Sequence, residues 1–271
     1  MDGKAGDFGV IETIDLMSIG SGTIVGFIIG LIGGGGSILA VPLLLYVVGV
    51  TSPHIAIGTS SVAVAVNAFA NLIGHARNGN VRWAYALVFS IAGIAGATIG
   101  SEIGRSFDGQ KLLIFFGILM VIISISMLVR KATSNDDYEP LTSKNAFVLL
   151  PKLIGMGVLV GTLSGFFGIG GGFLIVPGLM FAAKLPMIFA VGSSLVAVTI
   201  FGLITAVSYT ISDLVDWHIA FLFILGGLLG GIFGTALAQK LSSHKRFFTR
   251  VFASIVAVVG IYIVIRGLYA I

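Results

Sequence analysis

The sequence predicts an all-α integral membrane protein, a polytopic helical bundle built from two repeats, and three observations lead to this class. The 271 residues are 57% hydrophobic and only 10% charged, with a mean hydropathy of +1.11, whereas soluble domains carry about 25% charged residues. Several charge-free runs reach the roughly 17–25 residues that a spanning helix needs. A glycine-rich break occurs once in each half of the chain. Because the apolar runs do not alternate, we expect helices rather than barrel strands.

The charge-free runs define the expected spanning helices. They are Ile55–Gly74, Trp83–Ser101, Leu112–Val129, Met187–Ser212 and Trp217–Gln239, with Phe247–Ile265 as a weaker candidate. The 39 glycines suit close packing, because small residues let helix backbones approach one another in a membrane. The chain has no cysteine, which excludes disulfides and thiolate metal sites. The basic residues lie in short loops, so the pI of 9.4 does not indicate a nucleic-acid partner.

The two glycine-rich breaks have matching sequences. The first reads GLIGGGGSILAVP from Gly30 to Pro42, and the second reads GFFGIGGGFLIVP from Gly165 to Pro177. Downstream, AIGTSSVAV at 56–64 matches AVGSSLVAV at 190–198 in nearly the same register. This regularity indicates an internal duplication. We expect a first repeat at 17–130, a polar cytoplasmic linker at 131–149 and a second repeat at 150–267, which together form one transport domain.

Loop charges distinguish two topologies for the broken segments, Ser18–Val50 and Leu153–Ala183. If these segments cross fully, the two halves are parallel; if they enter and return as hairpins, the halves are inverted. Only the hairpin arrangement places most lysines and arginines in cytoplasmic loops, as the positive-inside rule requires. The returning arms would be about 21 and 17 Å long as helices, short of a roughly 30 Å hydrocarbon core. We therefore expect two inverted repeats, each with a re-entrant segment and three spanning helices, and both termini outside.

The breaks predict an anion-binding site at mid-membrane. Short helices that begin near Ser37 and Phe173 would point their N-termini at each other. Each helix start carries about half a positive charge and several unpaired N–H donors, and paired breaks in two halves are a general sign of a transporter site. The candidate substrate-binding residues are Gly34, Gly35, Gly36, Ser37, Gly170, Gly171, Gly172, Ser60, Ser61, Ser193, Ser194, Asn67 and Asn71, with His75 and Arg77 as a candidate gate.

Each candidate also has a structural alternative that the sequence leaves open. The glycine breaks could serve as hinges or packing sites. Serine and threonine in membrane helices usually bond to their own backbone, and Asn67 and Asn71 could join helices rather than contact ligand. His75 and Arg77 lie at an expected cytoplasmic helix end, where a solvated role is the simpler one.

The duplicated break ending in Val-Pro, followed by GTSS at 58–61 and GSS at 192–194, resembles the TauE/SafE sulfite exporter family of bacterial and archaeal membrane proteins. The resemblance covers residues 18 to 266. It implies a multi-pass protein of a prokaryotic cytoplasmic (inner) membrane that transports sulfur-containing anions such as sulfite, sulfonates or sulfoacetate. Members differ in substrate and direction, so the particular anion, and import or export, stay open. GGGS at 34–37 stands opposite IGGG at 169–172, so the two ends of the site are not equivalent.

The expected partners are a small sulfur oxyanion or organosulfonate and the lipid bilayer; a homodimer stays open, and neither a cofactor nor a bound metal is expected. All 11 acidic residues lie outside the expected spans or at their edges, whereas proton or sodium coupling usually uses an intramembrane carboxylate or histidine. Backbone carbonyls could still bind Na⁺, so coupling stays open. An intramembrane enzyme, or a non-transporting assembly subunit, is the alternative to a transporter. Against an enzyme, the sequence contains neither an HExxH motif nor a nucleophile–histidine arrangement. An assembly subunit would leave the matched glycine breaks unexplained.

Overall fold

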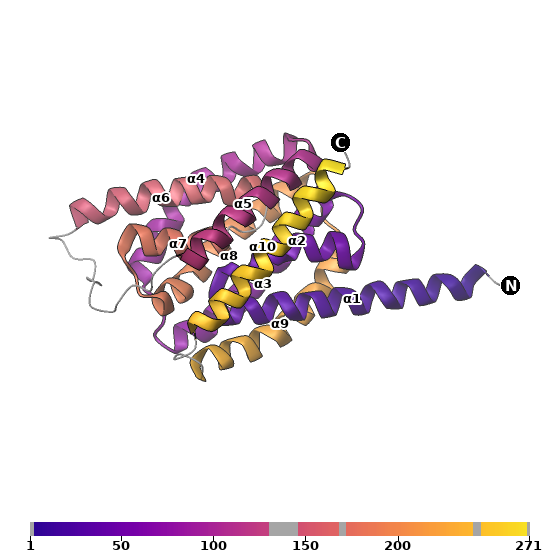
Figure 1. The fold of residues 1–271 in the computed structure, drawn as a ribbon, viewed down its shortest axis with the longest axis horizontal. Helices are drawn as coiled ribbons and strands as arrows, with labels where there is room; N and C mark the ends of the chain where they lie inside the picture. Colours follow the sequence, from indigo (N-terminus) through magenta and orange to yellow (C-terminus); the bar gives the residue numbers. More distant parts are fainter. Residues whose placement is uncertain (1–2, 130–145, 168–171, 241–244, 270–271) are drawn as a thin grey trace.

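The computed structural model describes residues 3–129, 146–167, 172–240 and 245–269, and the regular structure within them is helical. Figure 1 shows an elongated bundle with both chain ends on the same side. The elements are α1 (Gly3–Ile32), η1 (Gly33–Leu39), α2 (Ala40–Leu43), η2 (Leu44–Val48), α3 (Pro53–Arg77), α4 (Trp83–Ser106), α5 (Gly109–Val129), α6 (Ala146–Phe167), α7 (Gly172–Ala183), α8 (Met187–Ile211), α9 (Trp217–Lys240) and α10 (Lys245–Tyr269).

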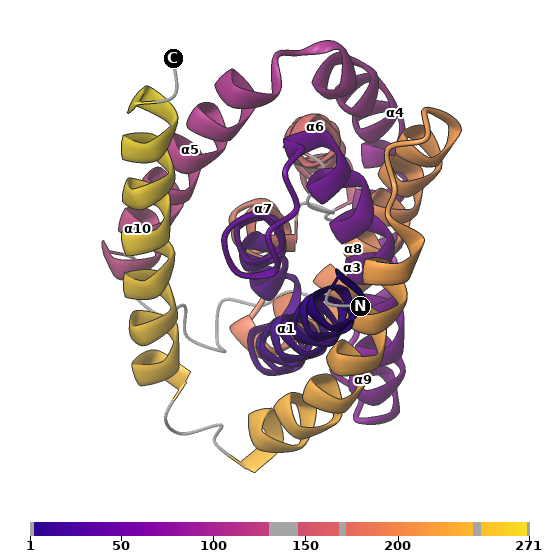
Figure 2. The ribbon, with the colours of Figure 1, turned by 90° about the vertical axis from the view of Figure 1, so that its right-hand side faces the viewer.

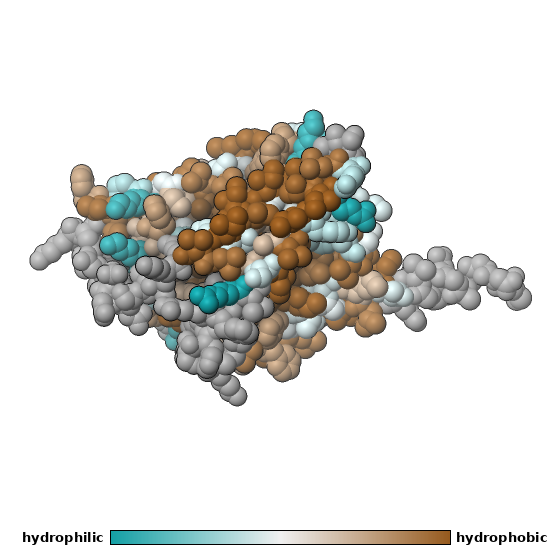
Figure 3. All heavy atoms as spheres, in the orientation of Figure 1, coloured by the Kyte–Doolittle hydropathy of each residue, from teal (hydrophilic) through white to brown (hydrophobic). Residues whose placement is uncertain are grey.

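Seven helical segments in the described part of the chain are long and apolar enough to cross a membrane. Five of them, α3, α4, α5, α8 and α9, coincide with the predicted charge-free runs. The other two are Thr13–Val48, which contains both arms of the first broken segment, and Phe147–Phe167, which contains the first arm of the second. α10 holds only the shorter apolar stretch Ala253–Tyr269. Apolar side chains cover much of the surface in Figure 3, as a lipid-facing surface requires. The predicted class, a polytopic all-α membrane protein, is confirmed.

In the first broken segment the chain turns back on α1 at the glycine run. Gly33 has a φ of +80°, which glycine adopts without steric cost, and a Cβ atom on Gly36 would lie 2.5 Å from the backbone nitrogen of Ile29. The returning arm is a 3-10 helix (η1), a short α-helix (α2) and a π-helical turn (η2), instead of the one short helix that the sequence predicts. The glycines weaken a regular α-helix, and Pro42 has no N–H for its ladder.

The second broken segment agrees with the prediction at the start of its returning arm, because α7 begins at Gly172. The boundaries on either side differ. α1 begins at Gly3 instead of near residue 17, and α6 begins at Ala146, inside the stretch assigned to the linker. Residues 146–150 read AFVLL, an apolar run that favours helix in lipid over a polar loop. Most of the linker, residues 130–145, lies outside the described residues, and the division into repeats stays a prediction.

The first long helix of each half packs against a helix of the other half. α1 lies along α9, and α6 lies along α4. In both pairs the helices are parallel and meet at glycines, where an added Cβ atom would lie within 3.0 Å of the partner backbone. Between α1 and α9 these contacts are Gly22–Phe223, Gly26–Gly227 and Gly30–Gly231. Between α6 and α4 they are Gly157–Phe89, Gly161–Gly93 and Gly165–Ala97. Only residues without side chains permit such an approach, so the glycines fix the register between the halves.

The equivalent helices α3 and α8 pack against each other at the centre of the bundle. They run antiparallel, because a Cβ atom on Gly58 would lie 3.0 Å from the Tyr209 Cβ, and one on Gly202 would lie 3.0 Å from the Ala65 Cβ. α5 packs mainly on α10, and Figure 2 shows this pair as one wall of a ring of helices that surrounds the two broken segments. The equivalent helices α3 and α8 thus run in opposite directions, while the inversion of the two halves across a membrane stays a prediction.

Candidate functional site

The two glycine breaks meet at the centre of the bundle. η1 packs against α7, and the closest approach is between Gly34 and Gly172: a Cβ atom on Gly34 would lie 2.5 Å from the Cα of Gly172, and one on Gly172 would come still closer to the Gly34 carbonyl. Both residues are buried. The contact is between backbones, so neither position has room for a side chain, and the two breaks are closed on each other.

Two serines bind the polar backbone of the first break. The N–H of Gly34 donates to Oγ of Ser194, 3.3 Å away in the other half, and the Ser194 hydroxyl itself donates to the Val191 carbonyl at 2.7 Å. Ser37 donates to the Gly34 carbonyl at 2.8 Å. Ser194 and Ser37 are fully buried. The structure therefore brings Gly34, Ser37, Gly172 and Ser194 together, and their role in anion binding stays a prediction.

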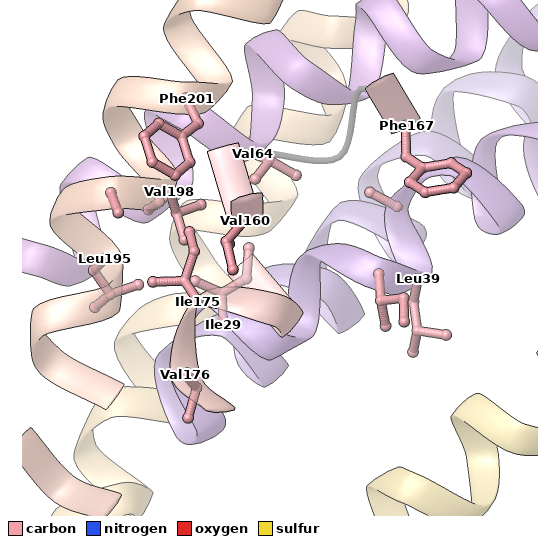
Figure 4. Packing of buried hydrophobic residues seen from close by; sticks show 14 of the residues in the cluster. Ile29, Leu39, Val64, Val160, Phe167, Ile175, Val176, Leu195, Val198 and Phe201 are labelled. Atoms are coloured by element: carbon pink, nitrogen blue, oxygen red, sulfur yellow. The ribbon is translucent and has the colours of Figure 1, made fainter. Parts of the chain in front are cut away.

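The surroundings of this contact are aliphatic. Val64 of α3 and Val198 of α8 are equivalent in the two repeats, and both are buried with Val160 and Ile175 in one cluster. Figure 4 shows these four side chains close together. A Cβ atom on Gly34 would come within 3.0 Å of a methyl carbon of Val198. The walls of the site are thus apolar, and its polar groups come from the breaks and the serines.

Ser60 and Ser61 of α3 are buried and turned toward their own helix. Their hydroxyls donate to the Ile57 carbonyl at 2.9 and 2.8 Å, which is the backbone bonding that serine commonly adopts within helices. Gly35 and Gly36 are buried within η1. The predicted site residues Gly170 and Gly171 lie outside the described residues.

Asn67 and Asn71 lie where α3 meets α1 and α9. Asn71 is held on both sides: its Nδ2 donates to the Asn67 carbonyl at 2.8 Å, and its Oδ1 accepts from the Thr235 hydroxyl at 2.8 Å. The Asn67 side chain is fully buried, yet neither amide atom has a hydrogen-bond partner among the described residues. An unsatisfied buried polar group costs about 1–3 kcal/mol. Asn71 therefore joins helices, whereas Asn67 has an amide free for a ligand or water.

His75 and Arg77 differ sharply in their surroundings. His75 is only 1% exposed, and its Nε2 lies 3.1 Å from the carbonyl oxygen of Gly30, at the start of the first break. The solvated role that its sequence position favours is therefore wrong for His75, because α1 covers the end of α3. Arg77 is exposed, which is consistent with the solvated role that its sequence position favours.

One function of the GTSS and GSS motifs is not apparent from the sequence. The Ser193 hydroxyl accepts the backbone N–H of Arg82 at 2.8 Å, and the equivalent Thr59 hydroxyl accepts the N–H of Asp216 at 2.9 Å. Each bond joins the start of one central helix to the loop of the other half. The signal that could have revealed this is that Arg82 and Asp216 also occupy equivalent positions in the duplication.

The buried polar residues of the described chain include a single histidine and no Asp, Glu, Lys or Arg. The described residues also contain no group of three or more His, Asp or Glu side chains that could hold a metal ion. A ligand at the break contact would therefore meet backbone amides, hydroxyls and an amide side chain. Such donors favour negative charge without the desolvation cost of a buried cation.

Comparison with known proteins decides the family. The family model described as "Sulfite exporter TauE/SafE" matches residues 18–263. This chain belongs to the TauE/SafE family. A probable membrane transporter protein of Xylella fastidiosa is 54% identical to it over 254 residues, which cover 93% of this chain and 95% of that protein.

More distant TauE/SafE relatives also match along nearly their whole length. The probable membrane transporter protein YunE of Bacillus subtilis is 28% identical over 270 residues, covering 92% of this chain and 97% of YunE. A probable membrane transporter protein of Methanocaldococcus jannaschii is 28% identical over 261 residues, covering 89% of this chain and 94% of that protein. No solved structure shows a significant match. The chain is accordingly a TauE/SafE membrane transporter with multiple apolar helices.

Proposed function

We propose that this TauE/SafE transporter moves sulfur-containing anions, of the sulfite, sulfonate or sulfoacetate type, across a prokaryotic cytoplasmic membrane, without catalysing a reaction. The observation that carries the proposal is the direct contact between Gly34 and Gly172 of opposite halves, with the Gly34 amide bound to Ser194. In this proposal the anion head group binds where the breaks meet, at the Gly34 amide that Ser194 holds in position. The family description supports the sulfur chemistry.

The charge distribution supports a compact anionic head group. α7 begins at Gly172, the residue that contacts Gly34, and a helix start carries a partial positive charge. The buried polar set of the described residues holds no formal positive charge, so a singly charged or delocalised oxyanion is matched better than a dianion. The aliphatic wall of Val64, Val198, Val160 and Ile175 tolerates varied tails, because it offers them no specific hydrogen bonds.

The closed contact also implies a movement. Because the two breaks touch backbone to backbone, an anion reaches the site only when they separate. We take the structure as a form closed toward both sides, with both termini outside and the linker in the cytoplasm as the loop charges predict.

A transport assay with matched head groups tests the proposal. The protein, reconstituted into liposomes, is expected to take up labelled methanesulfonate, and unlabelled sulfite is expected to compete. Methanesulfonamide keeps the shape of the sulfonate head without its charge, so it should not compete. If competition instead followed tail hydrophobicity and ignored head-group charge, the anion site would be wrong and a lipid-like substrate would replace it.

The two equivalent serines are expected to differ in their effect on affinity. Ser194→Ala removes the group that positions the Gly34 amide, so the apparent affinity for the anion should fall by about 0.5–1.5 kcal/mol, the net worth of a hydrogen bond. Ser60 donates to Ile57 within its own helix, so Ser60→Ala should change affinity less. Competition curves for both variants in the same liposome assay measure the difference. Equal losses for the two variants would contradict a site anchored by Ser194.

A further inference from the structure

The two matched bonds from Thr59 to Asp216 and from Ser193 to Arg82 lie outside the break contact and suggest a role in gating. We propose that they are the outer and inner latches of the transport pathway, each of which opens while the other stays closed. The proposal rests on the proposed transport function and adds to it the elements that control access.

The first latch joins α3 to the loop before α9. The Thr59 hydroxyl is fully buried and accepts the Asp216 N–H at 2.9 Å, while the Asp216 carboxylate accepts the N–H of Ile219 at 3.0 Å and so caps α9. The neighbouring Gly58 has no space for a side chain, because a Cβ atom there would press on the Leu214 carbonyl. The start of α3 and the start of α9 are therefore held as one unit.

The second latch repeats this arrangement at α8 and the loop before α4. The Ser193 hydroxyl is fully buried and accepts the Arg82 N–H at 2.8 Å. A Cβ atom on Gly192 would press on the Asn80 carbonyl, just as at Gly58. The guanidinium carbon of Arg82 also lies 3.6 Å from the centre of the Phe189 ring, a cation–π geometry that the first latch does not share.

The two latches lie at opposite ends of the central helix pair. α3 and α8 are antiparallel, with Gly58 near Tyr209 and Gly202 near Ala65, so the start of one helix lies beside the end of the other. Figure 2 shows α3 and α8 next to the broken segments that they flank. With the predicted topology, the Thr59 latch faces outside and the Ser193 latch faces the cytoplasm. Both are formed here, which agrees with a pathway closed at both ends.

The Ser193 latch adjoins the proposed site directly, and the Thr59 latch belongs to α3, which also carries Val64 of the site wall. Ser194 follows Ser193 in the sequence and accepts the Gly34 N–H at 3.3 Å. A shift of either helix start away from its loop would therefore alter the site on that side. The hydroxyl hydrogen bond of each latch is weak enough to break in each cycle, while the glycine contacts ensure that the latch closes in one register.

Sided labelling of a buried reporter cysteine tests the latches, and the chain has no native cysteine to interfere. The reporter is Val64→Cys, fully buried between the two latches, and the reagent is a membrane-impermeant maleimide on right-side-out or inside-out vesicles. Thr59→Val should raise labelling from outside about two- to tenfold, the population shift that a lost hydrogen bond gives. Ser193→Ala should raise labelling by a similar factor from the cytoplasmic side alone.

Two kinds of control separate gating from general loosening. Thr199→Val and Ser124→Ala remove hydroxyls that donate to their own helices, at 2.7 Å to Leu195 and 2.8 Å to Val121, and should leave labelling unchanged. Thr59→Ser and Ser193→Thr keep the acceptor and should restore the closed pattern. Equal increases from both sides, increases on the same side for both variants, or no change would overturn the proposal. No substrate is present, so this result stands apart from the outcome of the transport assay.

Discussion

Gly172→Ala is expected to abolish anion transport while the protein still reaches the membrane. The added methyl group would lie less than 3.0 Å from backbone atoms of Gly34. A flexible side chain could relieve such a clash by changing its rotamer, but these backbone atoms cannot. The two breaks must then move apart, which misplaces the Gly34 amide and fills the place proposed for the anion. We expect transport in liposomes to fall by at least about 100-fold, because misplacement of a positioned group by about 1 Å has effects of that order.

A matched control lies on the same helix. In Gly178→Ala the new methyl group would lie 3.3 Å from Val160 Cγ2 and 3.4 Å from the Phe89 ring, both of which are side-chain atoms able to adjust. Transport by this variant should stay near the wild-type rate. Wild-type transport by Gly172→Ala, or an equal loss in Gly178→Ala, would show that the break contact is not the site.

Gly230→Ala is expected to cause the largest loss of stability among the glycine-to-alanine variants of α9. Its methyl group would lie 2.8 Å from the backbone nitrogen of Phe27 and closer still to the Thr23 carbonyl, so α1 and α9 must separate along a long contact. Overpacking of this kind costs about 1–3 kcal/mol. The apparent melting temperature in detergent should fall by about 2–4 °C for each kcal/mol.

Gly20→Ala and Gly155→Ala are the controls for this effect. At both positions nothing lies within 4 Å of the added Cβ atom, and alanine has a higher helix propensity than glycine. Their melting temperatures should be unchanged or slightly higher. A fall as large as that of Gly230→Ala would mean that glycine matters for reasons other than close approach.

Matched positions in the two halves differ in chemistry. Asn67 and Phe201 occupy equivalent positions: the Asn67 amide lies against Gly227, while the Phe201 ring lies against the equivalent Gly93. One half therefore presents an unsatisfied amide where the other presents an apolar ring. The different residues of the two breaks already predict that the two ends of the site are not equivalent. The Asn67 and Phe201 side chains show the same difference in the helices around the site.

Local patterns were enough to determine the class of this protein. Hydropathy and run length are properties of contiguous sequence, so α3, α4, α5, α8 and α9 could be placed before any tertiary contact was known. The constant register of the duplication identified Gly34, Ser60 and Ser194 as candidates. The start of α7 at Gly172 also followed from the glycine run. The 3-10 and π-helical turns of the other returning arm did not, because glycine and proline weaken a regular helix without specifying what replaces it.

Only the tertiary structure decided which of the candidate groups are free and which are engaged. Ser193 binds Arg82, and His75 is buried against Gly30, because α3 and α8 cross antiparallel and α1 covers the end of α3. In both cases the two partners lie far apart in sequence. The Ser193 hydroxyl could equally have bonded to its own helix, as the Ser60 hydroxyl does. Helical periodicity specifies which face a residue occupies but not what lies opposite it. That choice is made by close approach at glycines such as Gly26 and Gly227.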